Sequence, residues 1–256
     1  MKDTGAKLSC ALIMIGIVLA FFPISEIYRY KKSEAVSDRS NAQAVEIARQ
    51  TETAPASVKE TVFGSDESRI APEDDIDIAA LKDVNPDTVG LLRLQGEEFP
   101  VVQAEDNTKY LTTGWNGEKT GCGAIFMDES CDGSSKNTIL YGHHMKSGKM
   151  FGNLGKYLSD EYAEEHPSFK WISAASVDTY EVTAVICTSA ADIKRYMDMD
   201  LKSDIDRLSE KAEETGKLYK DMGADDTYMS LITCEYEHED GRLIVIGRRA
   251  EHLERN

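Results

Sequence analysis

The stretch LITCEYEHEDGRLIVIGRR, residues 231–249, contains two apolar runs separated by a polar loop. Both runs are rich in the β-branched side chains that are typical of strands. We therefore expect a hairpin that places Cys234, at the end of the first strand, beside Arg242, at the start of the second. A neighbouring cation would favour the thiolate form of the cysteine and could steady an oxyanion. The same pattern also fits a buried strand thiol with a surface arginine.

Short β-type runs of this kind continue upstream and predict one mainly β domain over residues 76–256. Seven runs are separated by clusters of Gly, Asn, Asp and Ser, which is typical of a barrel or a sandwich; they are VGLLRL, FPVVQ, GAIFMD, NTILYGH, TYEVTAVICT, TYMSLITCEY and RLIVIG. Helices are expected at residues 76–85, before Pro86, and in two insertions, residues 150–166 and 200–222. The second insertion carries Leu201, Ile205, Leu208 and Ala212 at helical spacing.

The N-terminal part of the chain has a different composition. Residues 8–25 carry no charge, and as a helix they would span about 27 Å, close to the thickness of a bilayer core. No small-residue cleavage site follows, so we expect an uncleaved signal anchor after a cytoplasmic segment, residues 1–7. Lysine and arginine flank the anchor on both sides, so the charge count does not by itself set its orientation. Residues 26–75 predict a polar stalk or helical linker.

The charge balance argues against one class of partner. The 256 residues carry a formal net charge of −17, whereas a surface that binds nucleic acid needs a basic excess. We therefore expect no nucleic-acid partner.

A nucleophilic cysteine usually needs an imidazole as proton carrier. His143 and His144 end the run NTILYGHH, and adjacent strand residues face opposite ways, so at most one of them points into a site. His238 is a further candidate by proximity to Cys234, although a loop positions an imidazole poorly. The cysteine and histidine spacings match no zinc motif, so no metal is expected. Cys122 and Cys131 could form a disulfide in an oxidising compartment.

Taken together and in order, these segments resemble the sortases, and class B most closely. The resemblance covers roughly residues 76–250 and rests on LKDVNPDTVGLLRL, FPVVQAEDNTKYL, GAIFMD, NTILYGHHMKSGKMFGNL, LITC and the arginine that opens RLIVIG. It implies a sortase-like eight-stranded β-barrel with an N-terminal helix and a long helix in the loop before the cysteine strand.

The resemblance also implies roles for individual residues. The Tyr-Gly-His pattern assigns the catalytic imidazole to His143, the Thr-Cys pattern assigns the nucleophile to Cys234, and the downstream arginine is Arg242. Thr233 and Glu235 are the expected substrate-binding residues, and no cofactor is implied. Tyr236 stands where some class B members carry an acidic residue.

The implied activity is transpeptidation by a membrane-anchored enzyme whose catalytic domain lies outside a Gram-positive cell. Its substrates would be surface proteins with a C-terminal sorting motif of the NPxTN or LPxTG kind, and the acceptor would be an amine of the peptidoglycan cross-bridge or of a pilin. Two other functions remain open: an extracellular cysteine peptidase that hydrolyses rather than transfers, and a non-catalytic surface binding module.

Overall fold

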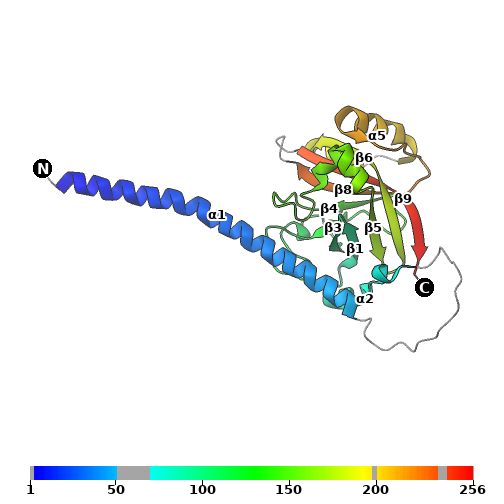
Figure 1. Ribbon diagram of the computed structural model, residues 1–256, viewed down its shortest axis with the longest axis horizontal. Helices are drawn as coiled ribbons and strands as arrows, with labels where there is room; N and C mark the ends of the chain where they lie inside the picture. Colours follow the sequence, from blue (N-terminus) through cyan, green and yellow to red (C-terminus); the bar gives the residue numbers. More distant parts are fainter. Residues whose placement is uncertain (1–2, 51–69, 198–200, 236–240, 256) are drawn as a thin grey trace.

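Eight strands form a closed β-barrel in the computed structural model of the chain (Figure 1). The structure describes residues 3–50, 70–197, 201–235 and 241–255; the side chains of residues 3–24, of Cys234 and Glu235 and of a few residues near 200 are outside this description. The sheet has nine strands in the order β5-β1-β2-β3-β4-β8-β9-β6-β7, and β5 also pairs with β6. That additional pairing closes a ring of eight strands, and β7 lies outside the ring as a further neighbour of β6. The expected eight-stranded barrel is thus confirmed.

The barrel strands range from three residues to fourteen, and the two longest, β6 and β9, lie side by side. Parallel pairing occurs between β2 and β3 and between β4 and β8, and the remaining neighbours are antiparallel. The strands are β1 (Thr88–Leu94), β2 (Glu97–Val102), β3 (Ile125–Met127), β4 (Asn137–Tyr141), β5 (Ser168–Ser173), β6 (Ser176–Ser189), β7 (Lys217–Leu218), β8 (Tyr228–Glu235) and β9 (Gly241–Glu254).

Two apolar clusters pack the barrel wall. The larger cluster includes Leu231, Val245 and Phe151, each fully buried, and it extends to the face of α5 that packs on β6. The smaller cluster packs Trp115 and Leu81, with other residues, between the outside of the wall and the helices that cover it. Burial on both faces explains why β8 and β9 read as nearly continuous apolar runs rather than as alternating ones.

Short helices lie at residues 78–84 and 154–165, within two of the three ranges where the sequence predicts helix. α2 (Ile78–Val84) begins after Asp77, whose Oδ1 accepts a hydrogen bond from the Ala80 N–H at 2.9 Å, and such an N-cap satisfies one of the unpaired N–H groups of the first turn. The 150–166 insertion forms the 3-10 helix η4 (Leu154–Leu158) and α3 (Asp160–Glu165). Two further 3-10 helices are η2 (Pro72–Asp74) and η3 (Lys109–Leu111).

The predicted long insertion before the cysteine strand is also helical. α4 (Ala190–Met197) and α5 (Leu201–Thr215) lie between β6 and β7 in sequence, and α5 packs on β6. Ile205, Leu208 and Ala212 form its buried face, as their spacing predicts. The helix ends earlier than expected, because Gly216 lies against the carbonyl of Val185 and the chain then pairs with β6 as β7.

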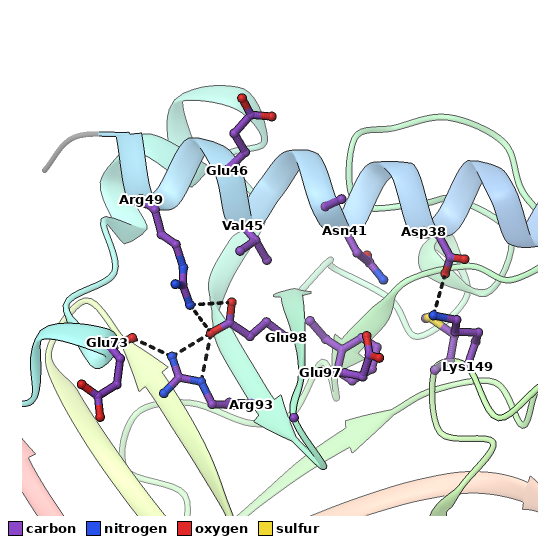
Figure 2. A pocket seen from close by; sticks show the side chains of 14 residues that line it. Asp38, Asn41, Val45, Glu46, Arg49, Glu73, Arg93, Glu97, Glu98 and Lys149 are labelled. Carbon is purple, nitrogen blue, oxygen red and sulfur yellow. Dashed lines mark hydrogen bonds and ion pairs between the residues drawn. The ribbon is translucent and has the colours of Figure 1, made fainter. Parts of the chain in front are cut away.

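The first helix is long, and its second half lies against the domain (Figure 1). α1 (Asp3–Gln50) contacts β2 and α2, with Ser37, Ser40, Ala44 and Ala48 buried along one face. Arg49 pairs with Glu98 of β2 at 2.7 Å, as Figure 2 shows. This part of the predicted linker is therefore packed on the barrel wall rather than spaced away from it.

No helix in the described part of the chain is long and apolar enough to cross a membrane. The segment predicted as the signal anchor, residues 8–25, falls almost entirely among the residues whose side chains lie outside that description.

Candidate active site

Three neighbouring strands bring the predicted catalytic residues to one rim of the barrel. β4 pairs with β8 in parallel register up to Tyr141 and Ile232, and the N–H of Gly142 then donates to the carbonyl of Ile232 at 3.1 Å. His143 lies two residues after Tyr141, and Cys234 lies two residues after Ile232. The two residues therefore occupy equivalent positions on adjacent parallel segments. The antiparallel register of β8 with β9 pairs Cys234 with Arg242, which is the placement that the hairpin pattern predicts.

A cleft of about 210 Å³ opens at this rim. His143, Thr233 and Arg242 line it together with mainly apolar neighbours, and these are Asn107, Leu111, Phe126, Tyr141, Gly142, Ile193 and Ile232. Its walls come from four parts of the chain: the η3 loop, the ends of β3 and β4, α4, and the β8–β9 pair. Cys234 and Glu235 end β8 at this rim, and the described part of the structure includes their backbone but not their side chains.

One hydrogen bond fixes the tautomer of the His143 ring. The ring Nε2 lies 2.8 Å from the carbonyl oxygen of Leu111. A carbonyl oxygen can only accept, so Nε2 carries the hydrogen and donates it. The other ring nitrogen, Nδ1, is then the atom that can take up or release a proton. His144 is not among the residues that line the cleft.

Thr233 lines the cleft and carries a buried hydroxyl. The residue is 3% exposed, and its Oγ1 has no hydrogen-bond partner among the described residues. A buried polar atom that lacks a partner costs stability, so it marks a position where a bound molecule could supply the missing partner.

Arg242 is half-buried and lines the cleft from the start of β9. One of its guanidinium nitrogens, NH1, donates to the carbonyl of Gly241 at 2.9 Å. The register of β8 with β9 sets this cationic residue at the same rim as the strand that carries Cys234.

A buried carboxylate holds two of the side chains that line the cleft. Asp128 is 2% exposed and accepts hydrogen bonds from Tyr141 Oη and Asn107 Nδ2, both at 2.9 Å. Burial by itself would raise the pKa of Asp128, but these bonds and those from Ser130 outweigh it and hold the pKa below its usual value. Burial, assisted by the charge of Asp128, raises the pKa of Tyr141, which stays a neutral donor.

The amide of Asn107 has only one orientation that fits its neighbours. Its Nδ2 faces the carboxylate of Asp128, which accepts, and its Oδ1 accepts from the N–H of Glu129 at 2.9 Å. A flipped amide would set oxygen against oxygen. Asn107, Leu111 and Tyr141 were not predicted as site residues. For Tyr141 the signal was its place beside His143 in the Tyr-Gly-His pattern, whereas nothing in the sequence pointed to Asn107 or Leu111.

The other described cysteines lie outside the cleft. Cys122 and Cys131 are free thiols, and both are buried. Burial raises the pKa of each thiol, which keeps them protonated and poorly nucleophilic. Among the described residues, no group of three or more His, Cys, Asp or Glu side chains could hold a metal ion.

A closed barrel whose rim gathers a histidine, an arginine and a cysteine-bearing strand around a small cleft defines a class: enzymes that transfer acyl groups through a thiol. A family model described as the sortase domain matches residues 93–250. The chain belongs to the sortase family and to its class B, whose members are cysteine transpeptidases.

Individual relatives agree with this assignment. Sortase B of Listeria monocytogenes is 31% identical over 176 residues, which cover 66% of this chain and 72% of that protein. The crystal structure of sortase B from Bacillus anthracis superposes with a TM-score of 0.66 at 29% identity, covering 88% of this chain and 99% of that one. A class B sortase of Streptococcus pyogenes that is involved in pilus biogenesis superposes with a TM-score of 0.59 at 26% identity, covering 68% of this chain and 97% of that one.

Proposed function

We propose that this enzyme cleaves a C-terminal sorting motif of the NPxTN or LPxTG kind after its threonine and transfers the protein to an amine. The observation that carries the proposal is the meeting of His143, Thr233 and Arg242 in one cleft, at the rim where β8 ends in Cys234. The catalytic residues are His143, Cys234 and Arg242.

In the first half-reaction the thiolate of Cys234 attacks the carbonyl carbon of the threonine. A carbon–sulfur bond forms, the carbonyl oxygen takes the negative charge, and the amide carbon–nitrogen bond then breaks. The proton that the Cys234 thiol gives up to become a thiolate is held on Nδ1 of His143, while Nε2–H stays engaged with Leu111. The leaving amine takes this proton from Nδ1, and His143 returns to the neutral imidazole. The product is a thioacyl-enzyme.

In the second half-reaction the acceptor amine attacks the thioester carbonyl. His143 takes a proton from that amine, a new amide bond forms, and Cys234 leaves as a thiolate. Water in place of the amine would give hydrolysis, which the apolar walls of the cleft disfavour.

Two donors at the cleft suit the charge that develops on the carbonyl oxygen. The guanidinium of Arg242 stabilises it electrostatically or binds the substrate backbone, and the Thr233 hydroxyl donates to a substrate carbonyl. A substrate carbonyl bound to the Thr233 hydroxyl would be the hydrogen-bond partner that Thr233 Oγ1 lacks among the described residues. Glu235, the next residue after Cys234, is the further substrate-binding residue that we propose.

The same family membership supports a location at the cell surface. We propose that residues 8–25 form a single-pass anchor after a cytoplasmic segment of residues 1–7, with residues 26–75 as the connection and residues 76–256 as the extracellular catalytic domain. The partners are then surface proteins that carry the sorting motif, and the acceptor is an amine of the cell wall or of a pilin.

The experiment that tests this proposal uses the purified full-length chain in detergent beside Cys234→Ala. Both proteins are incubated with NPxTN-like and LPxTG-like peptides, with and without an added amine, and the products are identified by mass spectrometry. We expect a thioacyl adduct on Cys234 and ligated product that requires the amine; the alanine variant should give neither.

Other outcomes would contradict parts of the proposal. Cleavage with no transfer to any amine would indicate a peptidase. If the wild type and Cys234→Ala gave the same products with every peptide, Cys234 would not be the nucleophile.

A further inference from the structure

The hydrogen bond between His143 and Leu111 joins two loops, and one face of α1 contacts both of them. We call residues 109–124 the leucine loop and residues 142–153 the histidine loop. The imidazole belongs to one and its carbonyl acceptor to the other, so the orientation of the ring depends on how the loops lie relative to each other.

Ser33 of α1 holds the leucine loop by two hydrogen bonds. Its Oγ accepts from the N–H of Gly121 and its carbonyl accepts from Thr120 Oγ1, each at 3.1 Å. The N–H of Thr120 in turn donates to the carbonyl of Thr112 at 3.0 Å, directly beside Leu111. A short chain of bonds thus leads from α1 to the residue next to the acceptor of His143.

Ser37 of α1 holds the histidine loop. Its Oγ donates to the sulfur of Met150 at 3.7 Å, and both side chains are buried. Met150 forms an isolated β-bridge with His144, and the N–H of Phe151 donates to the carbonyl of His143 at 3.1 Å. A second short chain therefore leads from α1 to the other end of the same hydrogen bond.

The unusual backbone conformation of Met150 depends on its contacts with α1. Its φ is 53°, in the left-handed region that residues other than glycine rarely adopt. Such a conformation persists where the surroundings hold it. Two contacts with α1 lie beside this residue: the Ser37 contact, and the ion pair of Asp38 with Lys149 at 3.8 Å. Figure 2 shows the second as a dashed line.

Ser33 and Ser37 are one helical turn apart, so they share a face. We propose that α1 is the positioning element for the catalytic histidine: Ser33 and Ser37 keep the two loops in register, so that the Leu111 carbonyl holds the Nε2–H of His143 and leaves Nδ1 to the substrate. The inference rests on the proposed role of His143. Ser33, Ser37 and Met150 are positioning residues and touch no reacting atom.

The test compares the wild type with Ser33→Ala/Ser37→Ala in the full-length chain. The substitution at 33 removes the hydroxyl bond to the N–H of Gly121, the neighbour of Thr120, and keeps the backbone bond from Thr120 Oγ1. We expect kcat to fall about tenfold with KM changed less than twofold, because a shifted ring misplaces the proton carrier without altering the peptide-binding walls. By nuclear magnetic resonance, the Nε2–H of His143 should exchange with solvent faster in the variant than in the wild type. Ser33→Thr/Ser37→Ala keeps the hydroxyl at 33 and should recover part of kcat.

Ser40→Ala is the matched control. Ser40 lies on the same helix face, is 1% exposed, and its Oγ accepts from the N–H of Asn116 at 3.3 Å, at the far tip of the leucine loop. Loss of the Ser40 hydroxyl should leave kcat and the exchange rate of the His143 ring proton unchanged. The melting temperature should change about as much as it does in the double variant.

Two results would overturn the inference: unchanged kcat and ring exchange in the double variant, or an equal loss of kcat in Ser40→Ala, which would indicate general loosening of α1. A failure of the proposed function is distinguishable, because the wild type would then give no product while the ring-proton exchange would still report the position of His143.

Discussion

At the scale of single residues, Thr233 is unusual because its hydroxyl is buried at the cleft without a partner among the described residues. Replacement by valine keeps the volume and removes the hydroxyl. We expect Thr233→Val to fold with equal or higher stability, since a buried unsatisfied group is lost, while kcat/KM falls about tenfold because a donor to the substrate carbonyl is lost.

Thermal unfolding and steady-state kinetics on the same samples check this prediction. Thr233→Ser keeps the hydroxyl and serves as control, with activity close to that of the wild type. A valine variant with full activity would exclude the substrate-binding role of the hydroxyl.

The buried carboxylate of Asp128 predicts that the stability of the fold depends on pH. Its folded-state pKa lies below the ordinary value of 3.8, so its charged form stabilises the fold above about pH 4, and this contribution is lost as the pH falls through the folded-state pKa. Asp128→Asn should lower the free energy of unfolding by about 1–3 kcal/mol at pH 7, because donors are left without a charged acceptor.

The difference between wild type and Asp128→Asn should shrink as the pH is lowered from about 4 toward 2, which urea unfolding at several pH values would measure. Asp132→Asn is the control, since Asp132 accepts similar local bonds from Ser134 but is fully exposed. A difference that stays constant with pH would show that the carboxylate charge contributes nothing.

The predicted catalytic residues were accessible from the sequence because each stands in a short local pattern: Tyr-Gly-His, Thr-Cys, and an arginine that opens the next strand. Leu111 has no such pattern. It contributes a backbone carbonyl, which any residue carries, and it lies 32 positions from its partner His143. A contact of that kind depends on the packing of two loops and not on the identity of the side chain.

At the scale of secondary-structure elements, closure of the barrel depends on a close approach at Gly90 in β1. A Cβ added there would lie 2.4 Å from the ring of Trp171 and 2.6 Å from the carbonyl oxygen of Ile172, both in β5. We expect Gly90→Ala to destabilise the fold by about 1–3 kcal/mol, because the β1–β5 pair must separate. Urea unfolding measures the change.

Gly155→Ala is the matched control for Gly90→Ala, since a Cβ at residue 155 would meet no atom within 4 Å. Equal stability of the two variants would contradict the steric argument.

The strand that closes the barrel, β5, is also the one barrel strand that the seven predicted runs omitted. β5 has the sequence SFKWIS, in which Lys170 interrupts the apolar residues, and Lys170 is tied to the buried Asp74 by an ion pair. The hydropathy of the segment therefore hides its place in the sheet. By contrast, α5 was predicted from its spacing because a one-sided helix repeats its apolar positions within a single segment.

At the scale of the whole molecule, the sequence predicted a polar stalk where the structure packs the second half of α1 on the barrel. Most of the α1 residues that are buried in this contact are small, namely Ser37, Ser40, Ala44 and Ala48, and Ser33 adds hydrogen bonds. Small side chains let a helix approach closely, but they add little to hydropathy, so the composition of residues 26–50 resembles that of a solvated segment. The packing of α1 on the barrel could therefore not be predicted from the hydropathy and composition that distinguish a core segment from a linker.

The order of the strands has a consequence for when the protein becomes active. β9 lies between β8 and β6 and pairs with both, although it follows both in sequence. Until residues 241–254 have been synthesised, the strand that carries Cys234 lacks one of its two neighbours and the ring stays open. The nucleophile and the arginine therefore come together only once β9 is present, so that a chain cut short before β9 carries no working thiol enzyme.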